Sequence, residues 1–221
     1  MHKPYKIKEI FYTLQGEGAH SGRPAVFCRF SKCNLWNGKE NSRSQSVCNF
    51  CDTDFIGTDG ENGDVYKTPE DLAKKVFDLW PQQAGLKPFV VCTGGEPLLQ
   101  LDTLLIDAFH QHGFEIAIET NGTLPLPTGI DWVCVSPKGT SKVVVSECDE
   151  LKLVYPQIDA MPDQFEHIKA KCFYLTPKAD PLISNQSDLI NDPVTQQTIQ
   201  YCLAHPKWRL NLQSHKLINI P

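Results

Sequence analysis

A repeated order of apolar and polar segments constrains the fold of this chain more than any other feature of its sequence. Beyond residue 68, short apolar runs such as Phe89–Thr93 (FVVCT) and Phe114–Glu119 (FEIAIE) alternate with segments of helical periodicity. Such alternation predicts parallel strands with helices outside the sheet. We therefore expect an α/β fold, with either a doubly wound sheet or a complete or partial barrel. The predicted strands cover residues 5–14, 25–30, 89–93, 114–119, 132–136, 151–155, 173–176 and 208–212.

Local signals predict three helices. Thr68 is a suitable N-cap and Pro69 fits the first helical position, so a helix is predicted to begin there. A second is predicted from Leu98 to His112, with Gly113 as its stop, and a third from Asp192 to about Leu203. The expected inner face of the second helix contains Leu101, Leu104, Leu105, Ala108 and Phe109.

Five of the predicted strands are followed directly by polar residues. In parallel α/β folds the carboxyl ends of the strands form one edge of the sheet, where active sites gather. One such cluster would be an ordinary turn, since Gly, Asn, Pro and Ser are turn residues. Five clusters at five strand ends predict a shared site. They are Thr93–Glu96, Glu119–Gly122, Ser136–Lys138, Thr176–Lys178 and Gln213–His215.

Three of the nine cysteines lie in a polar stretch of the sequence. Cys33, Cys48 and Cys51 form the pattern C-x14-C-x2-C. A C-x2-C pair can direct two thiolates to one metal or cluster, and a third cysteine leaves one coordination position open. Three interpretations follow: unrelated thiols, a structural zinc site, or an iron–sulfur cluster with an open iron. The loop-like setting argues against the first, and the lack of a second C-x2-C or H-x3-5-H pair argues against the second.

The segment Gly94-Gly95-Glu96 favours the third interpretation, an iron–sulfur cluster with an open iron. Its glycines follow a buried strand and would allow the backbone to approach a ligand closely. The carboxylate that follows them can engage an ammonium group. This pattern suits a ligand that carries an amino-acid head group.

Composition excludes several classes of protein. The chain has 221 residues, 41% of them hydrophobic, and a formal net charge of −5. That balance argues against direct binding of nucleic acid. The sequence has no signal-peptide core and no apolar run of about 18 residues that could span a membrane, so we expect a cytoplasmic protein without disulfides. No linker or repeat is evident, and residues 1–221 are predicted to form one domain.

Seven short motifs occur from residue 13 to the last residue: TLQGEG (13–18), CRF (28–30), CDTD (51–54), TGGEP (93–97), ETNGT (119–123), SPK (136–138) and the final LQSHKLINIP. Together with the three cysteines and Phe50, they resemble the radical S-adenosylmethionine (SAM) superfamily and, within it, the family of 7-carboxy-7-deazaguanine synthases. The resemblance implies a partial parallel β/α barrel in a single domain, with residues 31–55 as the cluster loop.

One departure concerns the cysteine spacing. The superfamily's usual pattern is C-x3-C-x2-C, whereas 14 residues here separate Cys33 from Cys48. Some members of the synthase family carry the same longer loop, so the chain is similar to that subgroup. The resemblance implies no role for residues 34–47.

The resemblance implies a carbon–nitrogen lyase. Cys33, Cys48 and Cys51 would bind a 4Fe-4S cluster, whose fourth iron would be chelated by the amino and carboxylate groups of SAM. One-electron cleavage of SAM would give a 5′-deoxyadenosyl radical. The implied reaction is the ring contraction of 6-carboxy-5,6,7,8-tetrahydropterin to 7-carboxy-7-deazaguanine with release of ammonia, in queuosine and 7-deazapurine biosynthesis.

The resemblance also assigns ligands. Thr53 would offer its hydroxyl to Mg2+. Arg29 would pair with the substrate carboxylate through two hydrogen bonds, a surface ion pair being the alternative. The residues implied to bind SAM are Phe50, Gly95, Glu96, Ser136, Pro137, Lys138, Thr176, Pro177, Lys178 and Ala179. Those implied to bind the substrate are Leu14, Gln15, Gly16, Glu17, Arg29, Thr93, His215 and, through its main-chain carboxylate, Pro221.

Glu119 and His215 are the predicted catalytic residues. Glu119 is expected near the reacting ring, a strand-end carboxylate without a chemical role being the alternative. The resemblance further implies a homodimer and a flavodoxin-type reductant. Two other functions stay open: an activating enzyme for a glycyl-radical enzyme, and a zinc-stabilised binding module. The TLQGEG motif and Arg29 suit a small heterocycle better than a protein substrate.

Overall fold

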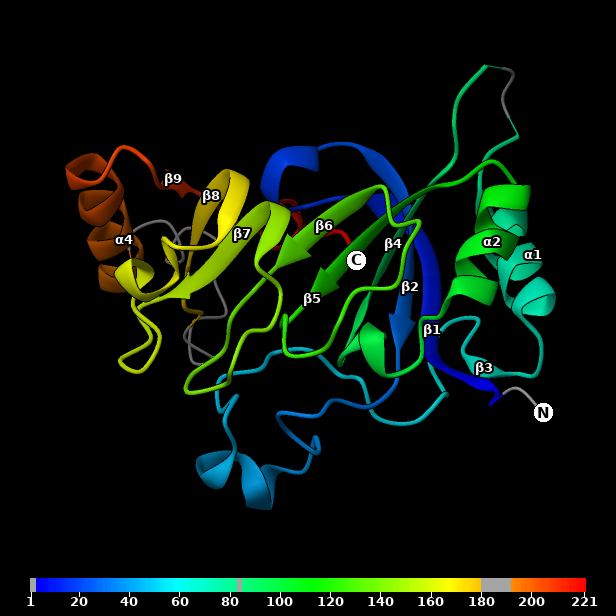
Figure 1. Ribbon diagram of the computed structural model, residues 1–221, viewed down its shortest axis with the longest axis horizontal. Coiled ribbons are helices and arrows are strands. Elements are labelled where there is room, and N and C mark those ends of the chain that lie inside the picture. The colour runs from blue at the N-terminus through cyan, green and yellow to red at the C-terminus, as the bar shows by residue number, and fades with distance from the viewer. Residues whose placement is uncertain (1–2, 83–84, 180–191) are drawn as a thin grey trace.

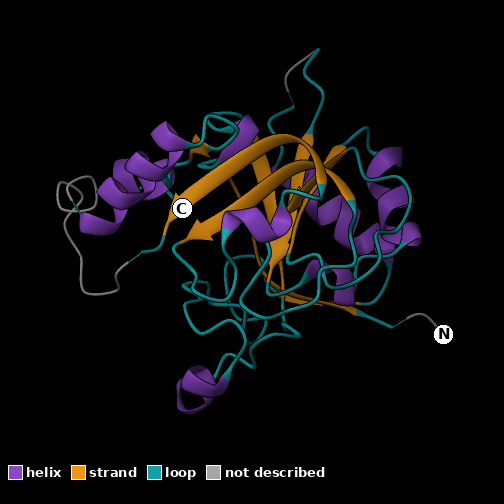
Figure 2. Ribbon diagram, turned by 60° about the vertical axis from the view of Figure 1, so that its left-hand side comes forward, coloured by secondary structure: helices purple, strands orange, loops and turns teal. Residues whose placement is uncertain are grey.

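A computed structural model describes residues 3–82, 85–179 and 192–221, and shows one curved nine-stranded sheet (Figures 1 and 2). The strand order is β3-β1-β2-β4-β5-β6-β7-β8-β9. The strands are β1 (Tyr5–Leu14), β2 (Pro24–Phe30), β3 (Asp64–Tyr66), β4 (Phe89–Gly94), β5 (Glu115–Thr120), β6 (Trp132–Val135), β7 (Glu147–Tyr155), β8 (Lys169–Pro177) and β9 (Arg209–Leu210).

Most of the sheet is parallel, as the alternating sequence predicts. Each neighbouring pair from β2 through β9 is parallel, and the α/β fold class is confirmed. The first strand differs, because β1 is antiparallel to both β2 and β3. A parallel pair needs a long crossover, whereas Leu14 and Pro24 are partners in register and are joined by a short connection. The connection of residues 15–23 is too short for a crossover and therefore imposes the antiparallel pairing.

Helices cover the two ends of the sheet. Helices α1 (Pro69–Leu79) and α2 (Thr103–Gln111) pack together beside β1 and β5, and α4 (Pro193–Ala204) packs on β8 and β9 (Figure 1). The predicted caps are present at two of these helices: the hydroxyl of Thr68 accepts a hydrogen bond from the Asp71 N–H, and the Asp192 carboxylate caps α4.

The predicted helix from Leu98 to His112 is wrong in its first turn. A short 3-10 helix, η3 (Pro97–Leu99), precedes it, and Asp102 then caps α2 by accepting from the Leu105 N–H at 3.1 Å. Because the helix begins at Thr103, Leu104 faces outward and is 53% exposed rather than buried. Four elements were not predicted: the short strand β3, the 3-10 helices η1 (Gly18–His20) and η4 (Pro162–Phe165), and helix α5 (Ser214–Ile218).

Two apolar clusters fill the two halves of the molecule. One combines β1, β2, β4 and β5 with α1 and α2, and includes the fully buried Phe30 and Phe109. The other joins β6, β7 and β8 to α4 and includes Trp208. Within the described part of the chain, no helix is long and apolar enough to cross a membrane.

Replacing Leu105 with Ala should destabilise the fold by about 2–5 kcal/mol, because its side chain is fully buried between α2 and the sheet. Leu104→Ala on the same helix is the matched control and should change the free energy of unfolding by no more than about 0.5 kcal/mol. Denaturant unfolding of both variants measures the difference. Equal losses would show that the orientation of α2 is wrong.

Candidate active site

A pocket of about 400 Å³ opens at the carboxyl edge of the sheet. The segment between β2 and β3, which contains the cysteine stretch, lies below this edge in Figure 1 and closes one side of the pocket. All five polar clusters that follow predicted strands contribute to its wall. They do so through Thr93, Gly94, Gly95, Glu119, Thr120, Asn121, Ser136, Lys138, Thr176, Pro177, Gln213 and His215.

The three cysteines meet in this pocket. Cys33, Cys48 and Cys51 all line it. Burial raises the pKa of Cys33, whereas a hydrogen bond from the Cys48 thiol lowers the pKa of Cys51 to about 6. In the described residues, no three His, Cys, Asp or Glu side chains converge as ligands of a single metal ion. Cysteines of a 4Fe-4S cluster each bind a separate iron, so three thiols in one pocket can hold three irons and leave the fourth open.

The insert between Cys33 and Cys48 is folded against the cysteines. It contains a 3-10 helix, η2 (Glu40–Gln45), whose Arg43 guanidinium lies 4.0 Å from the centre of the Trp36 ring. Arg43 also donates a hydrogen bond to the carbonyl oxygen of Cys51 at 2.9 Å. The insert therefore fixes the backbone at the last cysteine of the trio.

Gly95 allows the end of β4 to touch the cysteine segment. The Glu96 N–H donates to the Lys32 carbonyl at 2.8 Å, and the Gly95 N–H donates to the Phe30 carbonyl at 3.0 Å. A Cβ atom on Gly95 would lie only 2.0 Å from the Lys32 oxygen. Any side chain here would separate the strand end from Cys33. Gly94 has φ +120°, a conformation that favours glycine.

Glu96 is fully buried and does not line the pocket. Its carboxylate accepts hydrogen bonds from the Leu98 N–H, the Thr120 hydroxyl and the Asn121 N–H, at 3.0, 2.8 and 2.8 Å. It thus joins the ends of β4 and β5. A direct contact between Glu96 and a bound amino group stays a prediction.

The other residues implied to bind SAM lie on one side of the pocket. Pro137 and Lys178 do not line the pocket, although the Lys178 ammonium lies 5.2 Å from the centre of the Phe50 ring. The remaining predicted SAM-binding residues line the wall: Phe50, Gly95, Ser136, Lys138, Thr176, Pro177 and Ala179.

All residues predicted to bind substrate also line the pocket: Leu14, Gln15, Gly16, Glu17, Arg29, Thr93, His215 and Pro221. The Nε of Arg29 donates to Glu9 at 2.6 Å, so its ion pair lies within the pocket rather than on an open surface. His215 packs so closely on Gly16 that a Cβ there would be 2.1 Å from its Nδ1 atom. Burial lowers the pKa of His215, which is therefore a neutral imidazole at neutral pH.

Thr53 lies in the pocket between two acidic residues. Asp52 and Asp54 also line the wall, and each pairs with a lysine, Lys216 and Lys8 respectively. Hydroxyl and carboxylate oxygens of this kind are what Mg2+ prefers. The setting supports the predicted magnesium position without testing it.

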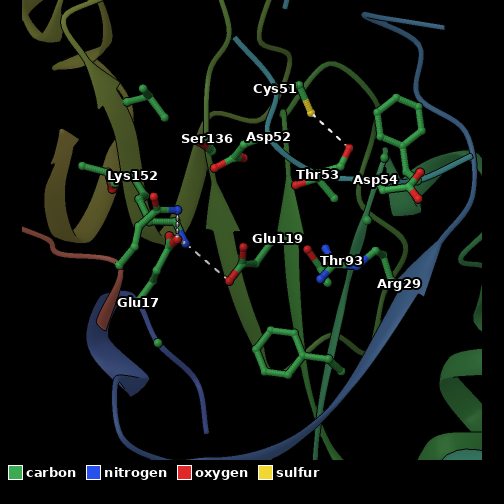
Figure 3. A pocket seen from close by; sticks show the side chains of 18 of the residues that line it. Glu17, Arg29, Cys51, Asp52, Thr53, Asp54, Thr93, Glu119, Ser136 and Lys152 are labelled. Carbon is green, nitrogen blue, oxygen red and sulfur yellow. Dashed lines mark hydrogen bonds and ion pairs between the residues drawn. The ribbon is translucent and has the colours of Figure 1, made fainter. Parts of the chain in front are cut away.

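Lys152 lines the pocket but was not predicted from the sequence. Its ammonium lies 2.8 Å from a carboxylate oxygen of Glu17 and 3.3 Å from one of Glu119 (Figure 3). The side-chain amide of Gln15 also donates to Glu119, at 3.1 Å. The sequence ELKLVY contains a signal for this residue, because Glu150 and Lys152 alternate with leucines and so indicate a strand with one polar face. The predicted strand began at residue 151 and left out Glu150, so the polar face was not recognised.

The site can now be compared with known proteins. The Radical SAM superfamily matches residues 43–147 of the chain. The chain is 53% identical over 217 residues to the 7-carboxy-7-deazaguanine synthase of Bordetella pertussis, covering 98% of this chain and 99% of that protein. It is 52% identical over 217 residues to the synthase of the same name from Caulobacter vibrioides, with the same coverage. Its fold is similar to the crystal structure of QueE from Escherichia coli, with a TM-score of 0.69 and 28% identity over 96% of this chain and 95% of that one.

Gly95→Ala should reduce the iron bound per chain after anaerobic reconstitution by at least about tenfold, because the new methyl group would push the cysteine segment away from β4. Gly113→Ala is the control: it introduces a side chain at φ +80°, but no atom lies within 4 Å of the new Cβ. Iron content and absorption near 400 nm measure the outcome. Equal iron in the two variants would contradict the role given to Gly95.

Proposed function

The chain belongs to the 7-carboxy-7-deazaguanine synthase family of the radical SAM superfamily, and we propose that its pocket contracts the ring of 6-carboxy-5,6,7,8-tetrahydropterin to give 7-carboxy-7-deazaguanine and ammonia. The chain is a radical SAM enzyme of the lyase type. One observation carries the proposed chemistry. Three cysteines and the polar ends of the parallel strands share a single pocket.

The cofactor side of the pocket is assigned to one group of residues. Cys33, Cys48 and Cys51 would hold the 4Fe-4S cluster, and Phe50 with the wall from Ser136 to Lys138 and from Thr176 to Ala179 would hold SAM. Bound there, the two groups supply one-electron chemistry that removes hydrogen from carbon. The protein positions the reacting carbon and excludes water. Gly95 would support this binding, because the lack of a side chain lets the end of β4 lie against the cysteine segment.

The opposite side of the pocket would bind the pterin. Gln15 and Glu17 offer a donor and an acceptor to its amide edge, and Arg29 offers a cation to its carboxylate. Thr53 would hold Mg2+ close to the same carboxylate. Glu119, with neutral His215 nearby in the pocket wall, would contact the reacting ring as an acceptor.

Further proposals rest on the family resemblance and on composition. We infer that residues 1–221 act as one domain, with residues 31–55 as the cluster loop, and that the enzyme is a homodimer reduced by a flavodoxin-type protein. We also infer a cytoplasmic location, where a reducing environment keeps cysteine thiols available to a cluster.

The anaerobically reconstituted protein should convert the tetrahydropterin to 7-carboxy-7-deazaguanine in the presence of SAM, Mg2+ and a reductant. Cys51→Ala should abolish this activity and the absorption near 400 nm, because it removes a cluster ligand. Cys202→Ala on α4, away from the pocket, should preserve both. Absence of product from a fully loaded protein would refute the proposed reaction. A zinc protein without the absorption would instead support a binding module.

Arg29→Lys should raise the substrate KM by about 10- to 100-fold, because an ammonium cannot reproduce the two parallel bonds of a guanidinium to a carboxylate. Arg23→Lys is the matched control, since Arg23 forms two 2.8 Å bonds to Glu115 and does not line the pocket. Steady-state kinetics with both variants test the assignment. A similar KM for Arg29→Lys and wild type would exclude Arg29 from the substrate site.

A further inference from the structure

A buried cation lies between two acidic groups of the pocket. The Lys152 side chain is only 6% exposed, and its ammonium contacts Glu17 at 2.8 Å and Glu119 at 3.3 Å. Each carboxylate has a second partner: Gln213 donates to Glu17 at 2.8 Å, and Gln15 donates to Glu119 at 3.1 Å. Figure 3 shows Lys152 and Glu17 side by side, with Glu119 next to them. The cluster carries one net negative charge.

The position of Lys152 follows from strand geometry. Successive residues of β7 point to opposite sides of the sheet, so the buried Leu151 and Leu153 face the apolar cluster under α4 and Lys152 faces the pocket. Val154, two residues further on, also lines the pocket. An ammonium on this face cannot reach solvent, and a buried charge is tolerated only when it is paired.

Titratable groups on several elements surround Lys152 and its two carboxylate partners. Glu17 comes from the segment after β1, Glu119 from β5, Cys134 from β6, Glu150 from β7 itself, and His215 from α5. Burial alone would lower the pKa of Lys152, but these negative neighbours raise it well above its usual value. The lysine is therefore a permanent cation and is a poor proton donor at neutral pH.

The pKa of the Glu17 carboxylate depends on this cation. Burial would raise its pKa, but the attraction and hydrogen bond of Lys152, together with Gln213, lower it to about 2. Lys152 also pairs with Glu119 over 3.3 Å, so one ammonium holds both carboxylates. Removal of the cation would leave two carboxylates in a poorly solvated pocket, where protonation of one relieves the repulsion.

We propose that Lys152 is a positioning residue for this reaction: its ammonium holds two carboxylates directed into the pocket, Glu17 for the substrate's amide edge and Glu119 for the reacting ring. The inference rests on the proposed function of the pocket. It explains why a lysine lies between the buried Leu151 and Leu153 of β7. Lys152 itself need not touch the reacting ring, because it acts through the two carboxylates.

The pH dependence of kcat/KM tests this proposal. In Lys152→Met, which keeps the length of the side chain without its charge, kcat/KM should fall by about 100-fold or more. The acidic limb of the profile should also move upward by about one pH unit or more, because Glu17 loses the cation that lowers its pKa. Lys152→Arg should keep the wild-type midpoint. A loss of activity with an unchanged midpoint would indicate a merely structural lysine and would overturn the proposal.

Lys171→Met is the matched control. Lys171 lies on the neighbouring strand β8, is 72% exposed and pairs with Asp149 at 2.6 Å outside the pocket. Its removal should leave both the rate and the pH profile unchanged. If Lys152→Met does not fold, Lys152→Gln keeps a hydrogen-bond donor for the two carboxylates but removes the charge. Its acidic limb should still move upward, and an unmoved limb would overturn the proposal.

A measurement without turnover separates this inference from the proposed reaction. In wild type, the pairing of Glu17 contributes stability above pH 4.5, the ordinary pKa of glutamate, and this contribution is lost as the pH falls towards 2. In Lys152→Met the carboxylates take up protons more readily, so stability should rise as the pH falls from 8 towards 5. The difference in Tm between the two cofactor-loaded proteins should therefore shrink in acid. A constant difference would refute the electrostatic role even if the reaction itself is confirmed, whereas a shrinking difference without product would count against the reaction alone.

Discussion

A buried carboxylate at the end of β4 holds the active-site edge together. Glu96 accepts three hydrogen bonds from η3 and from the end of β5, and its own N–H donates to Lys32 beside the cysteine trio. Hydrogen bonds to a charged group contribute about 1.5–3 kcal/mol each, and an unpaired buried carboxylate would be strongly unfavourable. The strand ends and the cysteine segment are therefore tied to one point, and Gly95 lets them come close enough for that contact.

The walls of the pocket separate two kinds of chemistry. The cysteine segment and the ends of β4, β6 and β8 present thiols, glycines and the residues around Phe50. The TLQGEG segment, β5, β7 and α5 present carboxylates, an amide, a buried lysine and a neutral histidine. One cavity thus offers ligands for a redox cofactor and polar partners for a heterocycle, so the two can bind next to each other.

The long insert gives the cysteine trio its support. In the described structure, Trp36 packs edge-on against Phe55 with ring centres 5.6 Å apart, and Arg43 stacks on Trp36 while it binds the Cys51 carbonyl. A shorter cysteine spacing could not include these contacts. The 14 residues after Cys33 thus form a brace for the cysteine segment, a role that the family resemblance does not supply.

The sequence by itself determined features that depend on neighbours along the chain. Alternating apolar runs gave the parallel strands, the pair Thr68-Pro69 gave the start of α1, and the cysteine spacing with the polar strand ends gave the members of the site. Such signals are local, because hydrogen-bonded caps and side-chain alternation act over a few residues.

Only the tertiary structure decided which polar residues serve the pocket directly. Leu104 is exposed because α2 begins at Thr103, after the Asp102 cap, rather than at Leu98. Glu96 turns into the protein because a donor of its carboxylate, the Thr120 hydroxyl, comes from β5. Lys152 is tolerated within β7 because Glu17 and Glu119 approach it from segments far away in the chain. A buried charge is stable only with its counter-charge, and only the folded chain brings the two together.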